Sequence, residues 1–220
     1  MDFIFVIGPS AVGKTTLAKE LFKHYNGVYF EQNMVPEFSI PEDCEDEGLF
    51  EEQVCWDNVL LQLKYFYEKG FRNIVALDFD DLRTIELPKI FKGYNFITLK
   101  LVSSNAEQIK EQMIYRHNNE GGLYDIENVI KSNEKIKNRK LLPNEVVIDV
   151  LEKSKEDVLN EAINIIDNFT PLLDYDYELD DENTFILIFE LMGRNSNIIL
   201  LNSENTIIDA LRKLPPSFDN

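Results

Sequence analysis

Basic residues and cysteines are scarce in this sequence. Its 22 Lys and Arg residues stand against 40 Asp and Glu residues, which gives a formal net charge of -18. Such a charge repels nucleic-acid backbones and anionic membrane surfaces, so we expect neither as a partner. Cys44 and Cys55 have neither metal-ligand spacing nor the density of a disulfide scaffold, and two reduced thiols are expected.

Long apolar runs are also missing. No run approaches the roughly 18 residues that span a bilayer, and the run Phe3–Ile7 follows an Asp rather than the basic start of a signal peptide. We therefore expect a soluble, cytoplasmic protein. Hydrophobic residues make up 44% of the 220 residues and charged residues 28%, which are globular proportions.

Short apolar segments alternate with helical patterns along the first three quarters of the chain. Strands are predicted at residues 3–7, 27–32, 73–79, 95–102 and 145–150. Helices are predicted at residues 14–25, 105–117, 125–139 and 155–169. A further helix, between the second and third strands, is predicted to end at Gly70. This alternation predicts an α/β fold with a five-stranded parallel sheet flanked by helices, which binds ligands at the carboxyl ends of its strands.

A glycine-containing motif joins the first strand to the first helix. It satisfies the P-loop (Walker A) pattern G-x-x-x-x-G-K-[ST], in the strand-to-helix context that gives the pattern its function. The expected nucleotide-binding residues are Gly8, Pro9, Ser10, Ala11, Val12, Gly13, Lys14, Thr15 and Thr16. Backbone N–H groups would cradle the phosphates of ATP, Lys14 would reach the β- and γ-phosphates, and Thr15 would ligate Mg²⁺. The alternative is a tight glycine turn without a ligand.

Three carboxylates lie at or just beyond the end of the predicted strand 73–79. Four apolar residues precede Asp78, the pattern of a strand-end acid that holds Mg²⁺ in P-loop proteins. Asp78 is the first candidate, with Asp80 and Asp81 as alternatives for the metal or for the proton of an acceptor hydroxyl. The competing interpretation is that all three only begin a loop.

Arginines that follow the predicted strands, or lie on the helices after them, are candidates for binding the transferred phosphoryl group. Arg116 and Arg139 flank the glycine-containing loop 118–122, which suits a closing lid, and we expect both to be catalytic. The expected acceptor-binding residues are Arg83, Asp80, Asp81 and Glu37, the last in the segment 33–38 that follows the second predicted strand. Solvated surface arginines and an ordinary loop at Glu37 are the alternatives.

Several segments together carry a family resemblance over residues 1–170. They resemble segments of the small P-loop kinases of the nucleoside-monophosphate, shikimate and gluconate kinase type, and also of bacterial P-loop proteins often labelled AAA-family ATPase. The segments are GPSAVGKTT, LDFDD, QIKEQMIYR, NRKLLPNEVVIDV and KSKEDVLNEAINIID. The resemblance implies the P-loop NTPase fold, a lid arginine near Arg116, another before the last strand as at Arg139, and phosphorylation of a small molecule by ATP. We do not recognise in residues 27–87 the motifs by which these families bind the molecule that they phosphorylate.

The C-terminal part differs from the rest of the chain in its amino-acid composition. An acidic linker at 171–183 precedes a predicted β-hairpin and short helix at 184–220. Residues 185–220 resemble a fragment of the NFACT, or fibronectin-binding-A-like, proteins. The resemblance lies in the sequence ILIFELMGRNSNIILLNSENTIIDALRKLPPS. Three explanations of this resemblance remain open. The segment could be the remnant of a truncated gene fusion, it could be an added segment that docks on the kinase-like domain, or the apolar hairpin sequence could be similar by coincidence.

The sequence therefore predicts a Mg-ATP-dependent kinase for an unidentified nucleoside, nucleotide, sugar or sugar acid. A regulatory P-loop NTPase without a small-molecule acceptor is the second hypothesis, and an interaction protein built around the terminal hairpin is the third. Neither an Asn-Lys-x-Asp sequence nor a Leu-Ser-Gly-Gly signature occurs, which disfavours GTPase switches and transporter ATPases.

Overall fold

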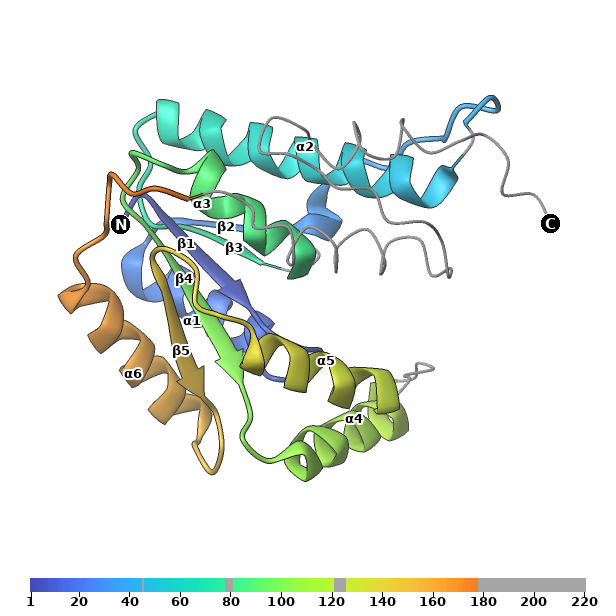
Figure 1. The fold of residues 1–220 in the computed structure, drawn as a ribbon, viewed down its shortest axis with the longest axis vertical. Helices are drawn as coiled ribbons and strands as arrows, with labels where there is room; N and C mark the ends of the chain where they lie inside the picture. Colours follow the sequence, from blue (N-terminus) through green and yellow to red (C-terminus); the bar gives the residue numbers. More distant parts are fainter. Residues whose placement is uncertain (45, 78–80, 121–125, 178–220) are drawn as a thin grey trace.

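The computed structural model describes residues 1–44, 46–77, 81–120 and 126–177. Five strands form one parallel sheet in the order β2-β3-β1-β4-β5 (Figure 1). The strands are β1 (Phe3–Ile7), β2 (Val28–Glu31), β3 (Ile74–Leu77), β4 (Phe96–Val102) and β5 (Glu145–Asp149). All five predicted strands and their parallel arrangement are thus confirmed.

Helices connect successive strands. They are α1 (Lys14–Tyr25), α2 (Glu47–Glu68), α3 (Leu87–Ile90), α4 (Ala106–Glu120), α5 (Ile126–Asn138) and α6 (Lys155–Asn168), with short 3-10 turns η1 (Gln32–Met34) and η2 (Asp81–Glu86). The helix predicted to end at His117 continues to Glu120. None of the helices in the described ranges is long and apolar enough to cross a membrane.

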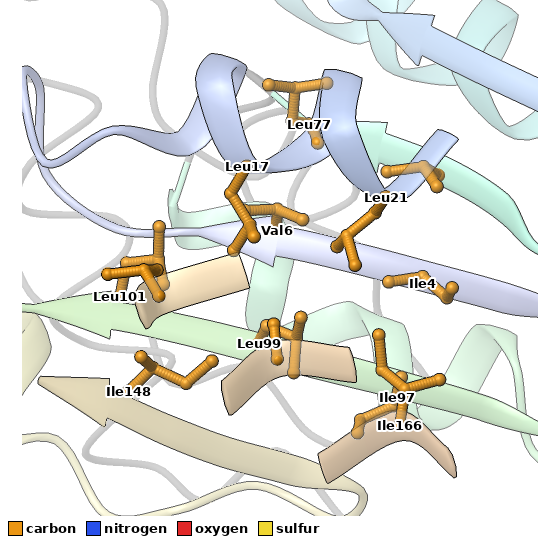
Figure 2. Close-up of a cluster of buried hydrophobic side chains, with 14 of the residues drawn as sticks. Ile4, Val6, Leu17, Leu21, Leu77, Ile97, Leu99, Leu101, Ile148 and Ile166 are labelled. Atoms are coloured by element: carbon orange, nitrogen blue, oxygen red, sulfur yellow. The ribbon is translucent and has the colours of Figure 1, made fainter. Parts of the chain in front are cut away.

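Strand side chains alternate between two apolar layers, because successive residues of a strand point to opposite faces. Phe3, Phe5 and Ile7 of β1 pack in a cluster with α2 and α3, around Trp56 and Phe91. The opposite layer joins the sheet to α1 and α6 (Figure 2). Its labelled members are Ile4, Val6, Leu17, Leu21, Leu77, Ile97, Leu99, Leu101, Ile148 and Ile166. Helices on both faces explain why the central strands β1 and β3 are apolar at every position rather than alternating in polarity.

α4 and α5 form a separate pair. They pack against each other beyond the carboxyl end of β4, and they project away from the sheet in Figure 1. The end of β4 holds this pair through Asn133 of α5, whose Oδ1 accepts from Ser103 N at 3.2 Å and whose Nδ2 donates to Ser103 O at 3.1 Å. Asn133 is fully buried. The pair is therefore attached at the edge of the sheet where the P-loop motif lies.

The segment after α6 packs back onto the domain. Leu172 exchanges two hydrogen bonds with the Asn144 side chain, at 2.8 and 2.9 Å. The hydroxyls of Tyr175 and Tyr177 donate to the carbonyl oxygens of Pro88 and Ile85, at 2.6 and 2.7 Å. The predicted hairpin and helix at 184–220 lie outside the described residues, and the division into a domain at 1–170, a linker at 171–183 and an extension stays a prediction.

Candidate nucleotide site

The loop between β1 and α1 has an unusual backbone. Gly8, Ala11 and Gly13 have φ angles of 143°, 65° and 102°. A Cβ atom on Gly8 would lie 2.4 Å from the carbonyl oxygen of Leu101 in β4, so this position excludes a side chain on two independent grounds. The motif therefore forms a curled turn that is held against the neighbouring strand.

The curl ends at the amino terminus of α1. Gly13 is the N-cap and provides no side-chain cap, so the N–H groups of the first turn receive no such partner from it. Lys14 folds back over the loop, and its ammonium donates to the carbonyl oxygens of Gly8 at 2.9 Å and Pro9 at 3.1 Å. Backbone donors, the positive end of a helix dipole and an ammonium group thus belong to the same short segment, which suits a polyphosphate.

A cavity of about 500 Å³ adjoins this loop. Its walls come from the loop and α1, from α4, from the segment between β5 and α6, and from the first turns of α6. They are lined by Ala11, Val12, Gly13, Thr16, Leu17, Glu20, Gln108, Glu111, Gln112, Tyr115, Val150, Lys153, Ser154, Lys155, Val158 and Leu159. The motif contributes Ala11, Val12 and Gly13 to this lining, and the other walls combine aliphatic side chains with two amides, a tyrosine, a serine, two glutamates and two lysines.

The wall that follows β5 is held in place by charged hydrogen bonds. Asp149 Oδ1 accepts from the backbone N–H groups of Ser104 at 3.1 Å and Leu151 at 3.0 Å. Although burial alone would raise it, these bonds hold the pKa of Asp149 below its ordinary value. Ser154 and Asp157 then form a reciprocal capping box at the start of α6. The wall is therefore held by hydrogen bonds within the protein itself.

The expected acceptor side lies at the carboxyl ends of β2 and β3. Glu37 is exposed, in the segment between η1 and α2. Asp78 and Asp80 fall outside the described residues, and Asp81 is placed only as the first residue of η2. Within the described ranges, no three acidic, histidine or cysteine side chains are grouped to hold a metal ion. The predicted Mg²⁺ and acceptor roles of these carboxylates stay predictions.

Arg83 is buried rather than solvated, with 5% of its surface exposed. Its Nε donates to Glu52 Oε1 at 2.8 Å and its Nη1 to Glu86 Oε1 at 3.0 Å, while its Nη2 donates to Glu52 and Gln53. Burial would lower the pKa of Arg83, but the two carboxylates raise it above its ordinary value. Arg83 could therefore meet an acceptor only by sharing or releasing these partners.

The two arginines predicted to be catalytic lie on α4 and just after α5. Arg116 is in α4, one turn beyond Gln112, and its side chain is outside the described part of the structure. Arg139 follows α5 and pairs with Glu145 at the amino end of β5, with an Nη2–Oε1 distance of 2.5 Å. The structure thus directs Arg139 to a buried carboxylate rather than to the loop, and its catalytic role would require this ion pair to open.

The amides and the β5–α6 wall were not anticipated from the sequence. Gln108 and Gln112 lie beside the apolar face of the predicted helix, where polarity alone gives no signal. Lys153 and Ser154 follow the carboxyl end of a parallel strand, which is the position where ligands bind in such sheets. That rule applied to the fifth strand would have indicated this wall.

Solved structures of small kinases share this fold. An unliganded sugar kinase from Janibacter sp. HTCC2649 matches with a TM-score of 0.54 and 16% identity, over 76% of this chain and 95% of its own. Shikimate kinase from Acinetobacter baumannii, in complex with shikimate, matches with a TM-score of 0.51 and 15% identity, over 77% of this chain and 96% of its own. The chain therefore has the fold of the small P-loop kinases.

The C-terminal part gives a separate match. A family model of the NFACT N-terminal and middle domains matches residues 173–219, in agreement with the resemblance in the sequence. No curated protein matches the chain. The chain thus combines a kinase fold with a short NFACT-like segment.

Proposed function

We propose that this chain is a Mg-ATP-dependent kinase that transfers the γ-phosphoryl group of ATP to a hydroxyl group of a small molecule. One observation carries the proposal: the curled loop and the cavity of about 500 Å³ are continuous, because Ala11, Val12, Gly13 and Thr16 belong to both. A triphosphate on the loop would place its nucleoside in the cavity. Pockets of this size and composition are typical of small-molecule ligands.

The far walls of the cavity suit a nucleobase. Val150, Val158 and Leu159 are aliphatic, Tyr115 offers an aromatic ring, and Gln112 offers an amide. A flat heteroaromatic ring buries apolar faces against such side chains and presents hydrogen-bonding groups at its edge. With the phosphates on the loop, a base would lie against these side chains.

The roles of the loop residues follow from charge. Lys14 would exchange the carbonyl oxygens of Gly8 and Pro9 for β- and γ-phosphate oxygens, which are far stronger acceptors. Mg²⁺, when bound, would neutralise charge on the same oxygens, with Thr15 and Asp78 as its protein ligands. Arg116 on α4 would bring a further cation if the α4–α5 pair acts as a closing lid.

The transfer step balances without any other reactant. The acceptor oxygen forms a bond to the γ-phosphorus, and the bond from that phosphorus to the β–γ bridging oxygen breaks. ADP leaves with the electron pair of that bond, and the hydroxyl proton passes to a carboxylate among Asp78, Asp80 and Asp81. The acceptor would approach from the side of β2 and β3, near Glu37 and Arg83, because the nucleotide takes the side of β4 and β5.

ADP formation tests the proposal. ATP consumption is measured with the protein alone and then with separate pools of nucleosides, monophosphates, sugars and sugar acids. Stimulation by one pool supports a kinase, whereas turnover that no pool changes would support the regulatory NTPase instead. Mass spectrometry of the stimulating pool should detect one compound heavier by one phosphoryl group.

A point variant ties the activity to the loop. Lys14→Ala should lower kcat/KM by about 10²–10³-fold, because it removes a cation aimed at the charge of the transition state. Lys64→Ala is the matched control, since it removes an exposed lysine of α2. Equal activity of Lys14→Ala and the control would contradict the site assignment.

A further inference from the structure

The long helix α2 has apolar side chains on two opposite faces. Trp56 and Leu63 face the sheet and are buried. Phe50, Leu61 and Tyr65 have 37%, 66% and 51% of their surface exposed. At about 3.6 residues per turn, their spacings of 11 and 4 residues align them along one line on the side of the helix away from the sheet. The outer face of a surface helix is usually polar, so this outer stripe of three large apolar residues suits a contact surface.

The end of the described chain lies on the same side of the sheet as α2. After α6 the chain crosses to α3, as Figure 1 shows, and Tyr175 packs in the apolar cluster of α2 and α3. The Tyr177 hydroxyl donates to Ile85 O in η2 at 2.7 Å. η2 is itself joined to α2, because Arg83 Nε donates to Glu52 Oε1 at 2.8 Å. The chain therefore leaves the described part of the structure one element away from α2.

The residues that follow need an apolar surface. The NFACT-like match covers residues 173–219, so it begins in the anchored segment and continues through the chain beyond Tyr177. The hairpin predicted there has two uninterrupted apolar runs, Phe185–Phe189 and Ile198–Leu201, and both of its faces would be apolar. A lone two-stranded hairpin is marginally stable in water. The predicted short helix can cover one face, and the other face needs a partner surface.

We propose that the outer stripe of α2 is the docking surface for the hairpin predicted at residues 184–202 of the same chain. The connection is long enough, since the chain from Tyr177 to Thr184 spans up to about 23–25 Å, and half the circumference of a helix about 10–12 Å wide is about 16–19 Å. Docking would cover the outer stripe with apolar side chains. Of the three explanations of the NFACT-like resemblance, this is the added segment that docks on the kinase-like domain.

Photo-crosslinking of the full chain tests the contact. Tyr65 is replaced by the photoreactive aromatic residue p-benzoylphenylalanine, the dilute protein is irradiated, and cross-linked peptides are identified by mass spectrometry. The expected product migrates as a monomer and joins position 65 to residues 184–202. The matched variant carries the same photoreactive residue at Phe22, an exposed position of α1 on the opposite side of the sheet. It should give no cross-link to residues 184–202.

Three other results would overturn the docking. A product that migrates as a dimer would make the outer stripe an interface between two copies of the chain. The absence of any cross-link at position 65 would leave the stripe in solvent. Cross-links to residues 184–202 from both positions 22 and 65 would mean that the segment has no preferred surface.

A charge substitution gives a second, independent measurement. Leu61→Glu places a carboxylate in the outer stripe, where covering it with apolar side chains is costly, so the backbone amides of residues 184–202 should exchange hydrogen at least about tenfold faster than in wild type. Gln62→Glu adds the same charge about 100° around the helix and should leave these rates unchanged. Equal rates in the two variants would contradict the docking. Neither measurement uses a nucleotide, so a failure of the docking is distinct from a failure of the proposed kinase function.

Discussion

The Gly8→Ala substitution tests how the loop is attached to the sheet. In the structure Gly8 has a φ of 143°, and a Cβ atom there would lie 2.4 Å from Leu101 O. An L-residue in such a backbone conformation costs about 1–3 kcal/mol. The contact adds a similar amount, about 1–3 kcal/mol, because the obstructing atom belongs to the backbone of β4 and cannot rotate away. The expected loss of stability is therefore about 2–6 kcal/mol.

Two other glycines separate these contributions. Gly13 and Gly70 have φ angles of 102° and 90°, and a Cβ atom on either would meet nothing within 4 Å. Gly13→Ala and Gly70→Ala should therefore lose only the conformational part, about 1–2 kcal/mol. Urea unfolding followed by circular dichroism measures the free energy of unfolding of each variant at a common slope.

The difference between the variants decides the matter. If Gly8→Ala is no less stable than Gly13→Ala and Gly70→Ala, the close approach of the loop to β4 is refuted. The account of why the motif needs its first glycine would then rest on backbone conformation alone.

Two further substitutions test the charged groups. Arg83→Met should lower the free energy of unfolding by about 2–4 kcal/mol, because it leaves two largely buried carboxylates without their cation. Urea unfolding should show that a second change, Glu52→Gln, recovers part of this loss, and full additivity would contradict the ion-pair assignment. Asp149→Asn should destabilise the protein at pH 7 by roughly 0.5–1 kcal/mol. The pKa of Asp149 is lowered in the fold, so its contribution is complete above the ordinary Asp pKa of about 3.9 and is lost as the pH falls through the folded-state value. Thermal melts at several pH values check this, and a difference that persists at the acidic end would count against it.

The strands and their parallel arrangement were predictable because burial on both faces gives uninterrupted apolar runs in the sequence, whereas the strand order was not predicted. Runs such as Phe3–Ile7 contain no polar residue, and glycine or asparagine turns end the helices between them, as at Asn26 with its φ of 50°. The position of the glycine-containing loop between β1 and α1 was predictable for the same reason, since a strand and a helix fix its two ends.

The arginines were less predictable, because their partners are set by tertiary contacts. Arg83 meets Glu52, which lies thirty-one residues earlier on α2. Arg139 turns to Glu145 at the start of β5, although its place before the last strand suggested the phosphate site. The position of an arginine along the chain predicts that it lies near an edge of the sheet, but it does not predict which carboxylate forms an ion pair with it.

Calorimetric titration of Mg-ATP into the wild-type chain and into Lys14→Ala tests the central claim most directly. The account predicts saturable binding at one site in wild type and binding weaker by at least about tenfold in the variant, since a charged hydrogen bond to phosphate is lost. The absence of binding heat in wild type, or equal dissociation constants for the two proteins, would contradict it.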